Sequence, residues 1–170
     1  MALFYPDRLV PRITDIDPDA LVQAGVRGLL LDVDNTLTTH DNPALAPSVR
    51  AWLERTAALG IRAVIVSNNR TERARPFAEA IGLPFIAKAR KPLRSGFRRA
   101  AALLGLQPEQ CLVIGDQVFT DVLGARLSGI ACIQVLPIEA EKGQHFIAFK
   151  RMLEKPIVQR FMRKQKEKKP

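Results

Sequence analysis

Apolar residues recur along the chain in two alternating patterns. Short runs rich in Val, Ile and Leu predict buried strands, and the segments between them carry apolar residues at helical spacing. The predicted strands cover residues 27–32, 61–67, 84–87, 111–116 and 131–136. The predicted helices cover residues 44–59, 71–81, 93–105 and 119–128. This alternation predicts an α/β fold, a doubly wound parallel sheet of about five strands.

The helix predicted at 44–59 shows the helical pattern well. Its apolar stripe consists of Leu45, Val49, Trp52, Leu53 and Leu59. Gly60 follows the stripe, as glycine commonly does where a helix ends. We therefore expect Trp52 to lie in the core rather than on a binding surface.

The first of these strands ends in a dense set of polar residues. Asp32 and Asp34 lie one residue apart after an apolar run, and Thr36 follows. Side chains two apart on a strand point the same way, and the carboxyl ends of parallel strands form the binding crevice of such sheets. Two converging carboxylates repel each other unless a cation or a shared proton offsets them. Taken alone, these residues could also form only a turn or a helix cap.

Later segments place polar residues at comparable positions. Ser67 and Asn68 follow the second strand, and Lys91 stands directly before a proline that begins a predicted helix. The fourth strand ends in a Gly-Asp pair that contributes Asp116, and Asp121 follows within the next predicted helix. Each segment is a weak signal alone, but all of them fall where a strand ends or a helix begins.

In this order the segments resemble the haloacid dehalogenase (HAD) superfamily, subfamily IIIA, whose phosphatases carry DxDxT, then Ser or Thr, then Lys, then GDxxxxD. The matching positions are Asp32, Asp34, Thr36, Ser67, Lys91, Gly115, Asp116 and Asp121. The resemblance implies hydrolysis of phosphomonoesters through an aspartyl-phosphate, with Asp32 as the nucleophile and Asp34 as the general acid and base. It also implies Mg²⁺ as the cofactor, because a phosphate dianion approaching a carboxylate needs added positive charge.

The resemblance assigns a role to each of the other positions. The implied metal-binding residues are Asp32, Asp34 through its backbone carbonyl, Asp116, and Asp121 either directly, through water, or by orienting Lys91. The implied phosphate-binding residues are Thr36, Ser67, Asn68 and Lys91. Lys88 is an alternative to Lys91 as the phosphate lysine, but the family places this lysine directly before a proline at a helix start.

The spacing of the motifs leaves no room for a cap domain, which many relatives insert to close over small substrates. Only 30 residues separate Thr36 from Ser67, and 23 separate Ser67 from Lys91. An uncapped crevice should be reachable by a phosphate on a large molecule or at a surface.

The composition of the chain indicates the cellular compartment in which it folds. The chain has 170 residues, of which 47% are apolar types, and this is enough for one core. No stretch approaches the roughly 20 apolar residues that cross a bilayer, and the first residues do not resemble a secretion signal. Cys111 and Cys132 fall inside predicted strands, so we expect buried thiols and no disulfide. We therefore expect a cytoplasmic protein, and peripheral contact at the inner face of the membrane would be made through the basic segment at the end of the chain.

Positive charge is concentrated at the end of the chain. Net charge is +9, and residues 142–170 contain ten Lys or Arg against two Glu, which gives this segment +8 and leaves about +1 for the rest. Its apolar residues Phe146, Phe149, Leu153, Ile157 and Phe161 follow helical spacing, interrupted at Pro156. We therefore divide the chain into a phosphatase domain, residues 1–141, and a basic amphipathic tail, residues 142–170, partly disordered from Arg163 onward.

Two readings of this tail remain open. A basic amphipathic segment is typical of a helix that binds anionic lipid at a membrane surface. Alternatively, the apolar residues dock the tail against the sheet while the lysines are solvated.

A closer resemblance covers nearly the whole chain to about Ile138. The opening segment from Pro6 to Leu21, together with DVDNTL, SNN, KARKPLRSGF and GDQVFTDVLGARLSG, is similar to the YqeG family of subfamily IIIA phosphatases. That family is related to phosphatidylglycerophosphate phosphatases of mitochondria and plastids. Those enzymes often have Lys between the two motif aspartates, where this chain has Val33.

Three functions follow as hypotheses. The first is a Mg²⁺-dependent phosphatase of phosphatidylglycerophosphate at a membrane surface. The second keeps the same site for a soluble phosphosugar, nucleotide or phosphoprotein. The third is a nucleic-acid or ribosome-associated binding protein that uses its basic residues on backbone phosphates, but no recognised RNA-binding motif is present and the catalytic set is intact.

Overall fold

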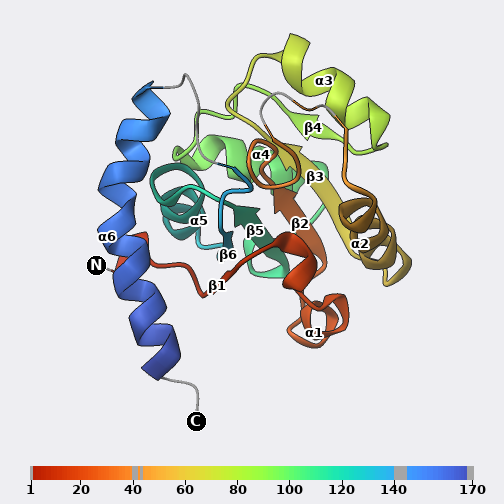
Figure 1. Cartoon of the computed structure of the whole chain (residues 1–170). Coiled ribbons are helices and arrows are strands. Elements are labelled where there is room, and N and C mark those ends of the chain that lie inside the picture. The colour runs from red at the N-terminus through yellow and green to blue at the C-terminus, as the bar shows by residue number, and fades with distance from the viewer. Residues whose placement is uncertain (1, 40–41, 43, 140–144, 168–170) are drawn as a thin grey trace.

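A computed structural model describes residues 2–39, 42, 44–139 and 145–167 (Figure 1). Its centre is a sheet of six parallel strands in the order β1-β6-β5-β2-β3-β4. The strands are β1 (Arg8–Val10), β2 (Gly28–Leu31), β3 (Arg62–Val66), β4 (Phe85–Ile86), β5 (Cys111–Gly115) and β6 (Ala131–Val135). This confirms the predicted α/β fold with a parallel sheet.

The sheet has six strands where about five were expected, because strand β1 has no counterpart in the prediction. It spans three residues, lies between Pro6 and Pro11, and pairs only with β6 at one edge of the sheet. So short a segment shows no apolar periodicity, and its strand conformation depends on hydrogen bonds to β6 that are distant in sequence.

The predicted helices are present with shorter bounds. The helices are α1 (Pro18–Gln23), α2 (Pro47–Ala58), α3 (Thr71–Ala80), α4 (Arg94–Leu103), α5 (Leu123–Ser128) and α6 (His145–Glu167). The helix expected at 119–128 is divided, because a turn of π-helix, η4 (Val118–Val122), precedes α5. Helix α1, which is six residues long, was not predicted.

Helices cover both faces of the sheet (Figure 1). Alternation along β2 directs Leu29 and Leu31 into the core that contains Trp52, and Leu30 into the core that contains Phe97. The Trp52 indole donates a hydrogen bond of 2.7 Å to the backbone carbonyl of Ile16, as a buried tryptophan requires. This confirms Trp52 as a core residue.

Both cysteines are buried free thiols, as predicted. Burial raises the pKa of the Cys111 thiol to about 11 and that of Cys132 well above its usual value. Both thiols therefore stay protonated and act as small apolar side chains.

Helix α6 packs beside the edge of the sheet that carries β1, at the left of Figure 1. Its Gln165 side chain bonds both the backbone N–H and the carbonyl of Leu9, each at 3.0 Å, so it covers part of the exposed β1 edge. The helix runs through Pro156, where an interruption was expected, because its contacts with the body offset the loss of one backbone hydrogen bond.

The structure describes only part of the predicted tail. Helix α6 includes residues 163–167, which the sequence analysis placed in a disordered end. Residues 140–144 and 168–170, and the side chain of Phe146, lie outside the described residues. Among the described helices, none combines the length and the apolar character that a bilayer span requires.

Candidate active site

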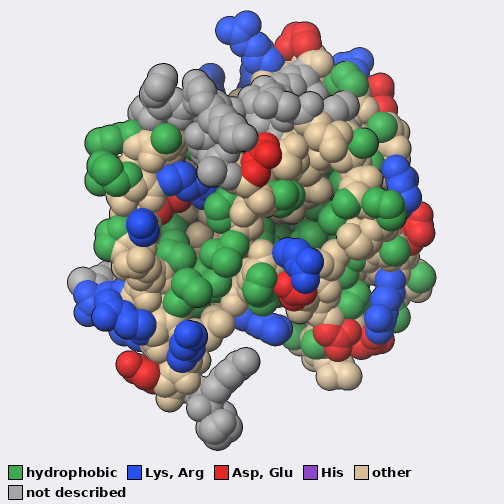
Figure 2. All heavy atoms as spheres, in the orientation of Figure 1, with side chains coloured by type: hydrophobic (Ala, Val, Ile, Leu, Met, Phe, Trp, Pro, Cys, Tyr) green, Lys and Arg blue, Asp and Glu red, His purple; other side chains and the backbone are tan. Residues whose placement is uncertain are grey.

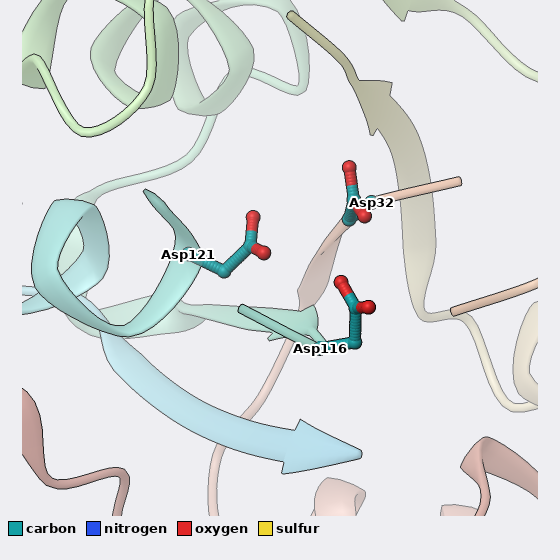
Figure 3. A group of neighbouring side chains, drawn as sticks. All are labelled: Asp32, Asp116 and Asp121. Carbon is teal, nitrogen blue, oxygen red and sulfur yellow. The ribbon is translucent and has the colours of Figure 1, made fainter. Parts of the chain in front are cut away.

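Three carboxylates meet at the carboxyl end of the sheet (Figure 3). Asp32 follows β2 and Asp116 follows β5, and these strands are neighbours, so the two side chains leave the sheet side by side. Asp121 reaches the same point from η4. One carboxylate oxygen of each residue lies within 4.8 Å of the others, and all three side chains are buried. Repulsion between these carboxylates requires positive charge nearby.

Lys91 supplies part of that charge. Its ammonium Nζ donates to Asp32 Oδ1 at 2.5 Å and to Asp121 Oδ1 at 2.6 Å, and its side chain is almost fully buried. Lys88, the alternative lysine, is exposed. The structure therefore places Lys91, and not Lys88, among the acidic residues.

Asn68 holds the backbone of Lys91 in place. Its Oδ1 accepts from the Lys91 N–H at 2.7 Å, and its Nδ2 donates to the Lys91 carbonyl at 3.1 Å. Both polar atoms of the amide therefore connect the end of β3 to the loop that carries the lysine. The expected contact of this amide with phosphate stays a prediction.

The remaining motif residues surround Asp32. The Thr36 hydroxyl donates to Asp32 Oδ2 at 3.3 Å. Ser67 is buried at the end of β3, and its Oγ accepts from the Asn69 N–H at 3.0 Å. Asp34 is half-buried, and its Oδ2 accepts from Asn69 Nδ2 at 2.7 Å. The partial exposure of Asp34 suits a group that exchanges protons, whereas Asp32 is enclosed.

Burial dominates the ionisation of the cluster. It raises the pKa of Asp32 to about 6, although the Lys91 charge acts in the opposite direction. It also raises the pKa of Asp116 well above its usual value, against the effect of Arg151. For Lys91, burial lowers the pKa, but the charges of Asp121 and Asp32 outweigh it and the net pKa is raised. Lys91 is thus a permanent cation, and the carboxylates are the groups in need of further positive charge.

A second cation comes from a residue that sequence reasoning did not find. Arg151 of α6 pairs with Asp116 Oδ2 through Nη2, and its Nη1 donates to the Asp116 backbone carbonyl at 2.8 Å. The same carbonyl accepts from Gln134 Nε2 at 3.0 Å. In the sequence Arg151 is one of many basic residues near the end of the chain, so no local signal distinguished it.

The cluster fits a hard divalent cation such as Mg²⁺. Within the described part of the chain, Asp116 Oδ1 is buried and has no hydrogen-bond partner. Burying a carboxylate oxygen without a partner costs free energy unless a ligand bonds to it. It belongs to a trio of buried carboxylates, and carboxylate oxygens are the donors that Mg²⁺ prefers.

Gly115 allows Asp121 to approach the sheet. A Cβ built at Gly115 would lie 2.4 Å from Asp121 Cγ, which is far inside the closest normal contact. We expect Gly115→Ala to displace the Asp121 carboxylate, to lower stability by about 1–3 kcal/mol through overpacking, and to weaken metal binding and activity together. Calorimetric Mg²⁺ titration and thermal unfolding measure the two effects.

Ile114→Val is the matched control for that substitution. It is one residue away in the same strand and removes a methyl group from the fully buried core, at a cost of roughly 0.5–1.5 kcal/mol. Since it places nothing against Asp121, it should lower stability without changing metal affinity. If Gly115→Ala binds Mg²⁺ as tightly as Ile114→Val does, metal binding does not require the present position of the Asp121 carboxylate.

Comparison with known proteins gives a consistent result. A family model described as haloacid dehalogenase-like hydrolase matches residues 8–129. The chain is 42% identical to "Probable phosphatase YqeG" of Bacillus subtilis, over 95% of this chain and 93% of that protein.

Other proteins in the comparisons are less similar to this chain. The chain is 28% identical to "Phosphatidylglycerophosphate phosphatase 1, chloroplastic" of Chlamydomonas reinhardtii, over 94% of this chain but only 63% of that longer protein. Among solved structures, an uncharacterized protein from Listeria monocytogenes serotype 4b matches 69% of this chain and 85% of its own, with a TM-score of 0.56 and 18% identity. At that identity the structural match supports the fold alone.

Proposed function

This chain belongs to the haloacid dehalogenase-like hydrolase family and is a phosphatase, and from this premise we propose that it is a Mg²⁺-dependent phosphatase of phosphatidylglycerophosphate at a membrane surface. The single observation that supports the chemistry best is the buried trio of Asp32, Asp116 and Asp121 with Lys91 bonded to two of them. The lipid substrate and the membrane location are supported by the relatives and by α6.

In the proposed reaction an Asp32 carboxylate oxygen attacks the phosphorus, so that an O–P bond forms as the bond to the leaving oxygen breaks. Asp34 protonates that oxygen, which departs as an alcohol. Water then attacks the aspartyl-phosphate, Asp34 takes its proton, and phosphate leaves while Asp32 is regenerated. Asp34 suits both proton transfers because its carboxylate is half-buried and held by Asn69.

Positive charge around the phosphoryl group is the second requirement. Lys91 would bond the phosphoryl oxygens from its position between Asp32 and Asp121, and the Thr36 and Ser67 hydroxyls would donate to them. A magnesium ion held by Asp32, Asp116, Asp121 and the Asp34 backbone carbonyl would supply further charge to neutralise the dianion.

Access to the site supports a large substrate. Between Thr36 and Ser67 the described residues form helix α2 and strand β3 and no cap domain. A hollow of about 580 Å³ adjoins Thr36, lined by the loop after β1, the start of α2 and the end of β6. A substrate could therefore extend away from its phosphate without being enclosed.

Helix α6 combines the two readings of the tail. Its second half docks on the body, where Phe161 packs against Tyr5 with ring centroids 5.5 Å apart. Its first half also contacts the body, through Arg151, but leaves Phe149, Met152 and Leu153 exposed at 54%, 61% and 45%. These three residues are spaced as neighbours on one side of the helix, and we call them the outer apolar face.

Basic residues lie along the other half of the same helix. Figure 2 shows Lys and Arg side chains gathered over the C-terminal half of α6, at the lower left. A helix that carries both exposed apolar side chains and basic ones has the combination that binds anionic lipid surfaces. The proposed location is therefore the inner face of the cytoplasmic membrane, bound peripherally, with residues 1–141 as the phosphatase domain and residues 142–170 as the membrane-binding segment.

We expect the double variant Phe149→Ser/Leu153→Ser to lose most of its vesicle binding. Burying two such half-exposed side chains in lipid contributes about 2 kcal/mol in total, so binding should weaken roughly 30-fold. The measurements are sedimentation with anionic vesicles and phosphate release from phosphatidylglycerophosphate in them, compared with 4-nitrophenyl phosphate in solution. Turnover of the soluble ester should not change.

Leu93→Ser/Leu103→Ser is the matched control, because these leucines are exposed at 55% and 53% but lie at either end of α4. This variant should bind vesicles as the unmodified chain does. If no phosphate is released from the lipid while 4-nitrophenyl phosphate is hydrolysed, the substrate is a soluble phosphate ester and the lipid assignment is wrong.

A further inference from the structure

Helix α6 contacts the residue that is best placed to bind the metal. The Arg151 guanidinium pairs with Asp116 Oδ2 and also bonds the Asp116 backbone carbonyl, so it fixes both the side chain and the main chain of this residue. Gln134 bonds the same carbonyl from β6. The Arg151 side chain is only 18% exposed and the Asp116 side chain is fully buried, so this ion pair is shielded from solvent.

Neighbouring residues of α6 hold the segment between the two metal-site aspartates. The Glu154 carboxylate accepts from the Phe119 N–H at 2.9 Å and pairs with Arg151 at 3.3 Å. Lys150 Nζ donates to Gln117 Oε1 at 2.8 Å. One turn of α6 therefore bonds three positions of the segment that leads from Asp116 to Asp121, and the acidic side chain of Glu154 is buried there.

These contacts leave Asp116 with one oxygen free for a ligand. Arg151 engages Oδ2, whereas Oδ1 is buried and without a partner among the described residues. We propose that Arg151 is a positioning residue for the metal: it holds Asp116 so that Oδ1 is presented to the cation, and it thereby links the docking of α6 to metal binding. This inference rests on the proposed magnesium dependence.

The charge of the cluster and the location of Arg151 both favour a role in positioning Asp116 over a role in competing with the metal ion. Arg151 also pairs with Glu154 at 3.3 Å, which offsets part of its charge, so the three carboxylates can still attract a divalent cation with Arg151 in place. Lys91 is the cation that bonds Asp32 and Asp121, whereas Arg151 lies on the Asp116 side. Hydrogen bonds that orient a metal-binding carboxylate reduce the ordering that must accompany metal binding.

Arg151→Gln should weaken Mg²⁺ binding at least about 10-fold, the usual effect of losing a group that orients a metal ligand. The measurement is calorimetric titration of the full chain with Mg²⁺ and no substrate. Arg151→Lys should recover part of the affinity, because an ammonium reaches Oδ2 but cannot bond the backbone carbonyl as well.

Arg163→Gln is the matched control for charge. It removes one positive charge from an exposed position of the same helix, and its metal affinity should equal that of the unmodified chain. Circular dichroism checks that each variant is folded. Tighter Mg²⁺ binding by Arg151→Gln would mean that Arg151 competes with the metal, and unchanged binding would mean that it has no role there; either result overturns the inference.

Hydrogen exchange of α6 provides an independent measurement. If the docking of α6 tightens Mg²⁺ binding by some factor, bound Mg²⁺ must stabilise docked α6 by the same factor, because linkage is reciprocal. Saturating Mg²⁺ should therefore slow amide exchange in residues 147–167 by that factor. Arg151→Gln should lose this effect. Exchange in α6 that is unchanged or accelerated by Mg²⁺ in the unmodified chain would contradict the proposed linkage.

The two measurements separate this inference from the function on which it rests. If Mg²⁺ does not bind the unmodified chain at all, the proposed magnesium dependence fails, and the inference fails with it. If Mg²⁺ binds equally well to the unmodified chain and to Arg151→Gln, the inference alone fails, and the phosphatase proposal stands.

Discussion

Asp32→Asn is expected to abolish phosphatase activity, with a loss of about 10⁴-fold or more in kcat. The amide has nearly the shape of the carboxylate but cannot attack phosphorus. Phosphate release from 4-nitrophenyl phosphate measures the loss. A covalent phosphoryl group on Asp32, detected by mass spectrometry after rapid acid quenching of the unmodified chain, should be absent from the variant.

The same substitution should leave the fold intact. Burial raises the pKa of Asp32 to about 6, above its ordinary value, so burying the ionised carboxylate lowers the stability of the folded state at neutral pH. A neutral amide removes that unfavourable burial and the repulsion from Asp121, while Lys91 keeps Asp121 as a partner. We therefore expect a Tm, measured without metal, that is equal to or above that of the unmodified chain.

Asp19→Asn provides the comparison for this prediction, because Asp19 is an exposed aspartate paired with Arg55 at the surface. It should retain full activity and nearly full stability. Substantial turnover by folded Asp32→Asn would show that another group attacks the phosphorus.

Lys91→Gln is expected to reduce both activity and stability. The ammonium bonds Asp32 and Asp121 at 2.5 and 2.6 Å, so its removal leaves two buried carboxylates without their shared cation. Breaking a buried ion pair from one side costs about 3–5 kcal/mol, which corresponds to a fall in Tm of about 10 °C for a chain of this size. Loss of charge near the phosphate should lower kcat/KM by about 10³-fold.

The stability loss should depend on pH in a defined direction. Lys91 lowers the pKa of Asp32, so its removal raises a value that burial has already brought to about 6. At pH 5, below the pKa of Asp32, the carboxyl is mostly protonated with or without Lys91 and needs no cation, whereas at pH 8 the ionised form that Lys91 stabilises in the unmodified chain has lost that cation in the variant. Thermal unfolding in the presence of a chelator should therefore show a smaller difference between variant and unmodified chain at pH 5 than at pH 8.

Lys88→Gln is the control, because Lys88 lies three residues away and is exposed. Its activity and Tm should match those of the unmodified chain at both pH values. If instead Lys88→Gln is inactive and Lys91→Gln is active, the two lysines have been assigned the wrong way round.

The amino-acid sequence by itself determined where the chemistry lies along the chain. Apolar runs ending in Asp32 and Asp116 identified two strands of a parallel sheet, because strands buried on both faces must be continuously apolar and their reactive groups must stand at their ends. That these two strands are neighbours was shown only by the structure. The residue types at those ends, with Ser67 and Lys91, carried the resemblance to a phosphatase superfamily. These signals are local, and local patterns can be recognised without knowing the fold.

Only the tertiary structure decided which of these residues touch one another. No pattern in the sequence showed that the Asn68 amide bonds the backbone of Lys91. The sequence showed Arg151 as one basic residue among many, whereas the docking of α6 brings it to Asp116. Strand β1 likewise exists only through its pairing with β6. In each case the partner is distant in the chain, and the interaction depends on the free energy of packing between elements rather than on any spacing of residues.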